Sequence, residues 1–266
     1  MSDVLAKYMD NPLSEYYICY FDILGYRAYF DNDTPEHKKF LATVLLALES
    51  IKSVLRNSNT PININCKTYS DNFLLYFEKR LLDQSQALET LINIMRKIQV
   101  KLLTDEGLLL RGGITLGGFY ADENLVFGKG LIRAVELEEK YAIAPRIIID
   151  EENFKSAVDT LIDSGKLIRD FDGYCFVNYF DVGALKLIKG QCIRLINIHC
   201  KYHMNVKDPT KIAQKEKIIS KYMWLLARFN SQCIRMGISE LVIKYDVKIN
   251  ERLCKPEIIA TSLSKK

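Results

Sequence analysis

The spacing of hydrophobic and polar positions changes several times along the first 150 residues of the chain. An apolar, aromatic-rich run, ICYF, leads directly into Asp22 and has the character of a buried strand. Farther along, apolar side chains recur at helical spacing with charged residues between them, and shorter runs predict strands. In chain order we expect a strand ending at Asp22, a helix over 34–56, two short strands over 64–79, a helix over 84–103, a Gly-rich strand over 108–121, a helix over 130–142 and a strand over 145–150.

The two short strands over 64–79 decide the fold class. Ser70, Asp71 and Asn72 between them supply turn chemistry, so the strands are expected to form a hairpin. A hairpin makes its strands antiparallel neighbours. Helices that return to one sheet around such a hairpin give an α+β sandwich, and not a doubly wound parallel sheet.

The pattern changes after Asp150. We expect a helix over 153–165, a hairpin over 167–180 with Asp172 and Gly173 in its turn, and two longer helices over 183–203 and 210–236. The sequence therefore predicts a domain over 15–150 and a mainly helical C-terminal extension over 151–266. The extension carries no motif that indicates chemistry, and Trp224, the sole tryptophan, is expected in core packing.

Composition narrows the class of protein. The chain is 48% hydrophobic and 26% charged, as in ordinary globular proteins, and no stretch is long and apolar enough to span a membrane. A net charge of +4 without a long basic run suits a small anionic ligand and gives no reason to expect nucleic-acid binding. Seven cysteines without CxxC spacing indicate reduced thiols, and with no N-terminal leader pattern we expect a cytoplasmic protein. His199 and His203 stand four apart, which we interpret as a helix face and not a metal site.

Two carboxylates are the strongest chemical signal. Side chains alternate along a strand, so Lys67, Tyr69 and Asp71 share a face if their strand reaches the turn. If the strand that ends at Asp22 lies beside this hairpin, Asp22 and Asp71 meet at one sheet edge. Close carboxylates repel unless they are protonated or bridged by cations, and Mg²⁺ bridges them while completing its shell with phosphates. The alternative is that Asp71 is a turn residue and Asp22 a helix cap.

Four segments carry a resemblance to a known family. In chain order, FDILGY, CKTYSDN, LRGGITLGG and FGKGLIRAVELEEK resemble the successive motifs of the class III nucleotidyl cyclase catalytic domain, over residues 15–150. The resemblance implies a ferredoxin-like βαββαβ fold, which is also the palm of related polymerases and cyclic-oligonucleotide synthases. It implies a nucleoside triphosphate substrate, cyclisation with release of pyrophosphate, and a head-to-tail homodimer. Small relatives in this family are antiphage pyrimidine cyclases that make cyclic CMP or cyclic UMP.

The resemblance also implies roles for particular residues. Asp22 and Asp71, helped by the Ile23 carbonyl, would hold two Mg²⁺ or Mn²⁺ ions. The backbone of Leu24, Gly25 and Tyr26 would lie under the triphosphate. Lys67 falls where adenylyl cyclases place a lysine that reads the base. The base itself is left open, because a lysine donor suits a pyrimidine O2 or N3 as well as an adenine N1.

The sequence departs from the family at three positions. Leu125 stands where the family has a polar residue that reads the base, and Ile132 and Glu136 stand where it has the Asn and Arg that stabilise the transition state. The nearest cations are Arg133 and Arg111, and we name both as candidates for that role. Two other functions fit these departures, namely a nucleotide-binding module without turnover and a palm-type synthase of cyclic oligonucleotides.

Overall fold

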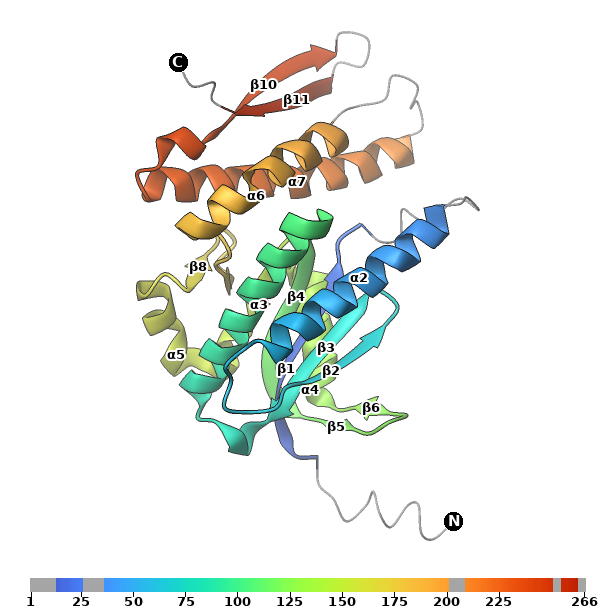
Figure 1. Ribbon diagram of the computed structural model, residues 1–266, viewed down its shortest axis with the longest axis vertical. Coiled ribbons are helices and arrows are strands. Elements are labelled where there is room, and N and C mark those ends of the chain that lie inside the picture. Colours follow the sequence, from blue (N-terminus) through green and yellow to red (C-terminus); the bar gives the residue numbers. More distant parts are fainter. Residues whose placement is uncertain (1–12, 26–35, 201–208, 251–254, 263–266) are drawn as a thin grey trace. The chain divides into compact units, whose positions relative to one another are not determined.

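The computed structural model describes residues 13–25, 36–200, 209–250 and 255–262. The chain divides into two compact units (Figure 1). The first unit comprises the described residues up to 98 together with 110–178, and the second comprises 99–109 with the described residues from 179 onward. No helix in the described ranges combines the length and the apolar character that crossing a membrane requires.

The first unit is built on a seven-stranded mixed sheet in the order β2-β3-β1-β4-β7-β9-β8. Strand β1 is antiparallel to both of its neighbours, β3 and β4, whereas β4 and β7 are parallel. A separate two-stranded hairpin, β5 and β6, follows β4. The strands are β1 Glu15–Ile23, β2 Asn65–Tyr69, β3 Asn72–Glu78, β4 Leu110–Gly118, β5 Tyr120–Ala121, β6 Val126–Phe127, β7 Ile147–Ile149, β8 Leu167–Arg169 and β9 Cys175–Val177.

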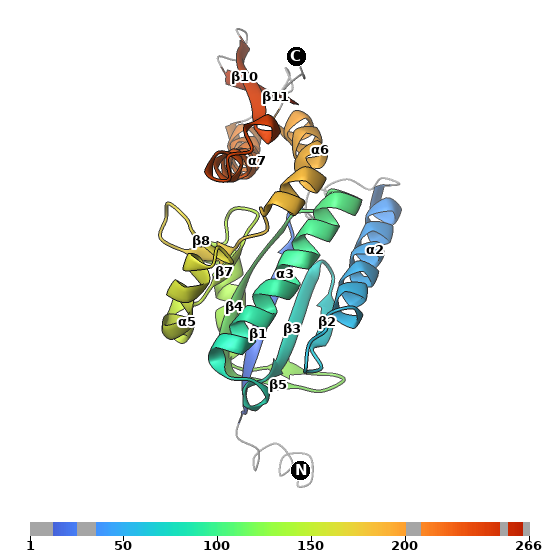
Figure 2. The ribbon, with the colours of Figure 1, turned by 60° about the vertical axis from the view of Figure 1, so that its left-hand side comes forward.

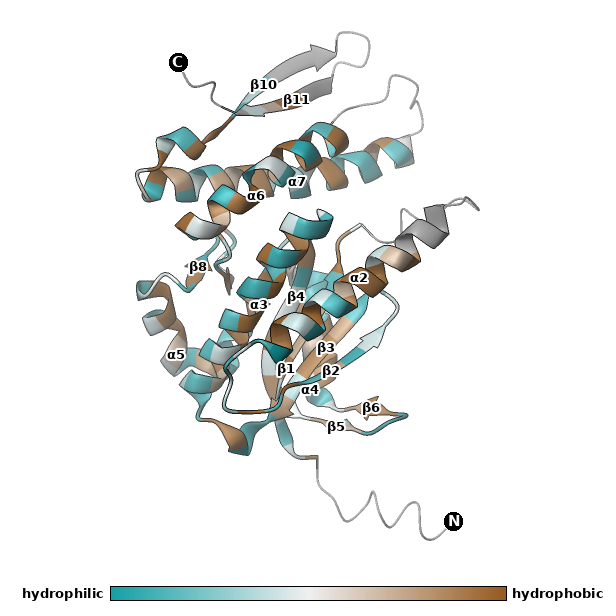
Figure 3. Ribbon diagram, viewed as in Figure 1, coloured by the Kyte–Doolittle hydropathy of each residue, from teal (hydrophilic) through white to brown (hydrophobic). Residues whose placement is uncertain are grey.

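Helices α2 and α3 lie side by side over one face of this sheet, as two views show (Figures 1 and 2). Hydrophobic and hydrophilic residues alternate along α3 and along the coloured part of α2, whereas β3 is largely hydrophobic (Figure 3). Helix α4 follows the β5–β6 hairpin, packs on β1 and β4, and continues into a π-helical turn, η3. The helical segments that contribute to this unit are α2 Glu36–Arg56, η2 Lys79–Leu81, α3 Gln84–Glu106, α4 Lys129–Glu136, η3 Leu137–Tyr141 and α5 Glu151–Asp163.

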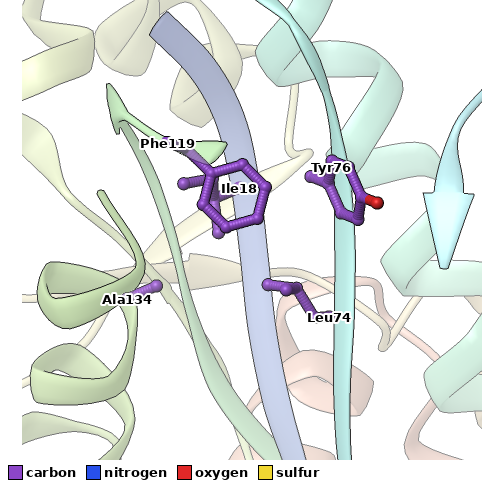
Figure 4. Close-up of a cluster of buried hydrophobic side chains, with 5 residues drawn as sticks. All are labelled: Ile18, Leu74, Tyr76, Phe119 and Ala134. Atoms are coloured by element: carbon purple, nitrogen blue, oxygen red, sulfur yellow. The ribbon is translucent and has the colours of Figure 1, made fainter. Parts of the chain in front are cut away.

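Side chains along β1 alternate between the two faces of the sheet, so that alternate residues of the strand have different surroundings. Tyr17, Cys19 and Phe21 are fully buried on one face of the strand. Ile18 points to the opposite face, where it packs with Leu74, Tyr76, Phe119 and the α4 residue Ala134 (Figure 4). Tyr20 and Asp22 share the parity of Ile18 and therefore lie on the α4 side.

Glycines in β4 allow the α4 segment to approach the sheet closely. A Cβ at Gly117 would lie 2.9 Å from the Gly130 Cα, and a Cβ at Gly113 would lie 2.4 Å from the Leu137 Cβ. Neither distance is tolerated between real atoms, so the Gly-rich strand is what lets α4 and η3 sit against β4.

The predicted order of elements through residue 150 and the predicted α+β class are confirmed. The boundary between the units differs from the predicted one at 150. The hairpin β8–β9, which the sequence placed in the extension, joins the first sheet because Ile148 of β7 pairs with Phe176 of β9. The first unit therefore continues to Asn178, and from Gln99 onward helix α3 belongs to the second unit.

The second unit contains two long helices, as predicted, and a hairpin that the sequence did not predict. The helices are α6 Val182–His199 and α7 Pro209–Arg235, followed by a 3₁₀ turn, η4 Ser239–Leu241, and the strands β10 Ile243–Asn250 and β11 Lys255–Ser262. The side chain of Asn230 exchanges hydrogen bonds of 2.9 and 2.8 Å with the backbone of Ile243, and Asn197 does the same with Ala260 at 3.1 and 2.9 Å. Two half-buried amides thus fix the hairpin to the helices.

Residues singled out in the second unit serve packing. Trp224 is buried beside Phe180, as expected. His199 stacks on Tyr222 with ring centroids 4.4 Å apart, and burial together with the nearby positive charges lowers its pKa to about 4. Its sequence neighbour His203 lies outside the described residues. All cysteines in the described ranges are free thiols, in agreement with the prediction.

Candidate functional site

The two acids predicted from the motifs meet at one end of the sheet. Asp22, at the end of β1, pairs in register with Asn72 of β3 on one side and with Arg111 of β4 on the other. The Ile23 N–H donates to the Asp71 carbonyl at 3.3 Å, which places Asp71 beside Asp22. Both aspartates are 8% exposed. Adjacent strand and turn therefore bring two nearly buried carboxylates together.

Tyr20 shows that these carboxylates lie on the same side of the sheet. Burial raises the pKa of the Tyr20 phenol, and the negative charges of Glu138, Asp22 and Asp71 raise it further. The phenol donates to Asn72 Oδ1 at 2.7 Å, and Asn72 Nδ2 donates to Asp71 Oδ1 at 3.3 Å. One phenol thus senses all three acids, which lie on the face of the sheet that carries α4 and η3.

Arg111 provides the cation of this cluster. Its Nε lies 3.0 and 3.1 Å from the two carboxylate oxygens of Asp22, and its Nη2 lies 2.8 Å from Oδ2. The same Nη2 is 2.6 Å from Oε1 of Glu138. Burial acts to lower the pKa of Arg111, but the contact with Asp22 outweighs it and the net change is upward. Arg111 is therefore shared between two acids.

Glu138 is a site residue that the sequence analysis missed. It lies in η3 and is 3% exposed. Burial raises its pKa to about 8, with a further contribution from Asp22, although Arg111 acts in the opposite direction. Its Oε1 forms the ion pair with Arg111 without a well-aligned hydrogen bond. The available signal was its spacing, because Glu138 stands four residues after Ala134, a buried position on the same helical segment.

The segment after β1 leaves room for a ligand. Gly25 has φ of +93°, a conformation that favours glycine, and a Cβ built there would meet nothing within 4 Å among the described residues. Its backbone is thus open to close approach by another molecule. Leu24 lies between Gly25 and the acidic end of β1, and Tyr26 lies outside the described residues.

Lys67 is brought next to the β5–β6 hairpin, although 55 residues separate it from the group it binds. Its Nζ donates to the carbonyl of Asp122 in the hairpin turn. The Asp122 carboxylate closes that turn by accepting from the backbone N–H groups of Asn124 and Leu125, each at 2.8 Å. Lys67 and the half-exposed Leu125, the two residues expected near the base, therefore belong to one neighbourhood.

Arg133, the second candidate arginine, binds Asp150 and not the Asp22–Asp71 pair. Its Nε and Nη2 bind the two carboxylate oxygens of Asp150 at 3.0 and 2.9 Å, and its Nη1 binds Glu136 at 3.1 Å. These contacts raise the pKa of Arg133, and Glu136 also accepts from Lys140 at 3.0 Å. Ile132 on the same helix is 66% exposed. Of the two candidate arginines, the structure brings Arg111 to the Asp22–Asp71 pair and ties Arg133 to Asp150.

The donor set at the Asp22–Asp71 pair suits a hard divalent cation. Mg²⁺ is commonly bound by one or two carboxylates and keeps its remaining positions for water and substrate phosphates. Asp22, Asp71 and the Ile23 carbonyl supply such oxygen ligands, and Glu138 adds further negative charge. Among the described residues, no three His, Cys, Asp or Glu side chains are arranged to enclose a metal by themselves. The arrangement therefore fits a cation shared with a phosphate-bearing ligand, and not a closed structural site.

Neither the protein-family models nor the curated proteins include a match to the chain. Among similar solved structures, the guanylyl cyclase domain of the RhoGC fusion protein from the aquatic fungus Blastocladiella emersonii is 13% identical, with a TM-score of 0.47, over 62% of this chain and 95% of that chain. The adenylate/guanylate cyclase/hydrolase from Silicibacter pomeroyi is 16% identical, with a TM-score of 0.39, over 62% and 96%. A class III adenylyl cyclase-like ATP-binding protein from Pseudomonas aeruginosa is 13% identical, with a TM-score of 0.34, over 52% and 33%.

These structures are class III adenylate/guanylate cyclase domains or resemble them, and this is the family whose motifs the sequence resembles. At identities and TM-scores this low, the chemistry has to be judged from the chain's own residues.

Proposed function

We propose that the first unit is a nucleotide cyclase domain that converts a nucleoside triphosphate into a 3′,5′-cyclic nucleotide and pyrophosphate. The observation that carries this proposal is the convergence of Asp22 and Asp71, both nearly buried, where β1 meets the β2–β3 turn. Two adjacent carboxylates suit a divalent cation, and the backbone at Gly25 beside them suits a triphosphate. The order of the four sequence motifs supports the same function.

In this proposal Asp22, Asp71 and the Ile23 carbonyl hold two Mg²⁺ or Mn²⁺ ions. When bound, the ions supply Lewis acidity, which favours loss of the 3′-hydroxyl proton and neutralises the leaving pyrophosphate. The 3′-oxygen then bonds to the α-phosphorus, the bond from that phosphorus to the pyrophosphate oxygen breaks, and the departing pyrophosphate carries away the 3′-hydroxyl proton. The protein's own part is to align the triphosphate along Leu24 and Gly25 and to exclude water with the packed face of β1.

Lys67 would orient the base. Its ammonium group is already directed at the β5–β6 turn, where it binds the Asp122 carbonyl, and a base acceptor atom would replace that partner. Leu125 in the same turn offers an apolar contact and no side-chain hydrogen bond, so the base is recognised through an acceptor. A pyrimidine O2 or N3 and an adenine N1 both meet this requirement. A pyrimidine product would suit the antiphage role that the family resemblance implies.

A head-to-tail homodimer would complete the site. Arg133 is bound within its own chain to Asp150, which leaves the transition-state charge to be met by groups such as Arg111 and by a second subunit. Ile132 on α4 and Phe127 on β6 are 66% and 57% exposed, and covering such large apolar side chains favours association. Sedimentation analysis of Ile132→Lys against the wild type tests this: a dimer that persists unchanged in the variant excludes this face.

A nucleotide-binding module without turnover is the second candidate. It is favoured by the exposed Ile132 and by Glu136, which is engaged with Arg133 and Lys140 at the positions where the family has its transition-state groups. Calorimetry separates the two candidates, because this module binds a nucleoside triphosphate tightly in the presence of metal and yields no product.

The decisive experiment incubates the purified chain with each of the four nucleoside triphosphates and Mn²⁺ or Mg²⁺, and identifies products by mass spectrometry. A cyclic mononucleotide that disappears in Asp22→Asn and in Asp71→Asn supports the cyclase, whereas a linked oligonucleotide selects the palm-type synthase. Asp163→Asn, an exposed acid at the end of α5, is the matched control and should retain full activity. Product formation that survives loss of both Asp22 and Asp71 would falsify the proposal.

A further inference from the structure

Arg111 occupies the position that a cation at Asp22 requires. It contacts both carboxylate oxygens of Asp22 at 2.8–3.1 Å. A divalent cation on the same carboxylate would face the positive charge of the guanidinium at close range, and the two charges repel each other strongly in a largely buried site. Metal binding and the present contact of Arg111 with Asp22 are therefore in competition.

Arg111 also cannot be released without a new partner. Its side chain is 22% exposed, and removing the partner of a largely buried charge is strongly unfavourable. Glu138 is a partner already in place, since its Oε1 lies 2.6 Å from the same Nη2 that binds Asp22. A small rotation of the guanidinium would exchange one acid for the other.

The backbone that carries Glu138 is firmly held. Leu137 lies directly over Gly113 of β4, and its carbonyl accepts from the Ala142 N–H at 2.9 Å. Arg146 donates to the Tyr141 carbonyl at 3.1 Å and is itself ion-paired with Asp170 and Asp172 in the β8–β9 turn. The backbone at Glu138 is thus held in place, so the exchange would take place by rotation of the Arg111 side chain.

We propose that Arg111 is the built-in counter-ion of Asp22 in the metal-free protein, and that Glu138 is the positioning residue that receives Arg111 when a divalent cation binds Asp22. The inference rests on the metal site of the proposed function, and it assigns a role to two residues outside the metal ligands. Glu138 thereby sets the affinity of the site for the metal without touching it.

The test measures Mn²⁺ binding in the absence of nucleotide, from the loss of the free-ion signal in electron paramagnetic resonance. At a pH where Glu138 is ionised, Arg111 in Glu138→Gln has Asp22 as its remaining anionic partner, and the Mn²⁺ dissociation constant should rise about tenfold, as expected for one charge pair. In Arg111→Gln the competing charge is gone, and the constant should fall about tenfold. Glu136→Gln, which removes an arginine-paired glutamate from the same helical segment, is the matched control and should leave the constant unchanged.

The double variant Arg111→Gln/Glu138→Gln separates positioning from direct ligation. If Glu138 acts through Arg111, its substitution has little effect once Arg111 is absent. An equal loss of affinity in both backgrounds means that Glu138 binds the metal itself and overturns the proposal. If Glu138→Gln binds Mn²⁺ with wild-type affinity, the proposed role of Glu138 is also overturned. The proposed function still stands in that case, provided that Mn²⁺ binding depends on Asp22. Absence of Mn²⁺ binding by the wild type overturns both.

A measurement on the wild-type protein covers the case in which the arginine variants do not fold. The Nε–H resonance of Arg111, assigned by its absence in Arg111→Lys or by its coupling to the side chain, reports the hydrogen bond to Asp22. Saturating Mg²⁺ should shift this resonance and speed its exchange with solvent. A resonance that is unchanged while Mg²⁺ binds shows that Arg111 stays on Asp22 and overturns the proposal.

Discussion

The first unit contains two acid clusters, one around Asp22 and one around Asp150. Both lie at the ends of central strands, but the pKa of the buried acid is raised in the first cluster, at Glu138, and lowered in the second, at Asp150. Asp22 and Asp150 each stand where a central strand ends or has just ended, and each is nearly buried and bound by an arginine. Asp150 accepts from Arg133 with both oxygens, from Thr115 Oγ1 at 2.7 Å and from Asn153 Nδ2 at 3.0 Å. Burial acts to raise the pKa of Asp150, but these donors lower it overall.

At Asp22 one arginine serves two carboxylates. Arg111 is shared with Glu138, and Asp71 lies on the other side of the strand end. The pKa of Glu138 is raised to about 8, which is the opposite of the shift at Asp150. An acid that is bound by several donors within its own cluster stabilises the fold, whereas a buried acid with a raised pKa is typical of functional sites. The comparison therefore separates a structural ion pair from a candidate active site.

The largest expected effect concerns activity. In Asp22→Asn, loss of a metal-binding carboxylate should reduce product formation by about 10³-fold or more, since metal charge neutralisation supplies several kcal/mol of transition-state stabilisation. Thr115→Val, which perturbs the Asp150 cluster, should retain activity within a few-fold. Initial rates by mass spectrometry check both. Equal losses in the two variants would mean that the clusters do not differ in kind.

The next largest effect concerns stability. Here the substitution at Asp150 should have a larger effect than the substitution at Asp22. Asp150→Asn weakens the hydrogen bonds that Arg133, Thr115 and Asn153 donate to this buried acid, and although Arg133 keeps Glu136, the free energy of unfolding should fall by about 2 kcal/mol. Asp22→Asn should change it by less than about 1 kcal/mol, because Arg111 keeps Glu138 as a partner. Urea unfolding followed by circular dichroism measures both values. A greater destabilisation by Asp22→Asn would contradict the assignment of Asp150 as the structural acid.

The two clusters should also respond to pH with opposite signs. The pKa of Glu138 is raised from 4.5 to about 8, so its stabilising contribution is present below pH 4.5 and is lost as the pH rises toward 8. The pKa of Asp150 is lowered from 3.8, so its contribution is present above pH 3.8 and is lost only as the pH falls below that value.

Urea midpoints of metal-free protein across this range provide the measurement. Relative to Glu138→Gln, which cannot ionise, the wild type should lose stability between pH 5 and pH 8, a range inside the window that the Glu138 shift defines. Relative to Asp150→Asn, it should lose its advantage only in acid. Parallel pH curves for the wild type and Glu138→Gln would show that Glu138 is ionised throughout.

The smallest effect isolates one hydrogen bond. Thr115→Val removes the hydroxyl that donates to Asp150 and accepts from Asn153 at 3.0 Å. Unfolding free energy should fall by about 1–2 kcal/mol, the usual cost of a buried hydrogen bond, with Mn²⁺ affinity unchanged. A change in Mn²⁺ affinity would show that the two clusters are coupled through β4.

Much of the fold was predictable because its signals are local. The helical spacing over 34–56 and 84–103 and the turn residues between β2 and β3 gave the correct order of elements. The β8–β9 hairpin was predicted as a hairpin but assigned to the wrong side of the boundary. Its partner is β7, and the pairing of distant strands leaves no mark in the local pattern. The β10–β11 hairpin was missed for the same reason, since two asparagines on distant helices fix it.

The sequence by itself determined that an acid ends β1 and that another occupies the following hairpin turn, because strand alternation and turn chemistry are properties of a few consecutive residues. Only the tertiary structure decided that Arg111 faces Asp22, that Arg133 faces Asp150 and that Glu138 is buried. Which arginine meets which acid depends on strand order and on how closely α4 and η3 approach β4. The electrostatic consequence of a charged residue is set by burial and by partners from distant segments, and these exist once the chain has packed.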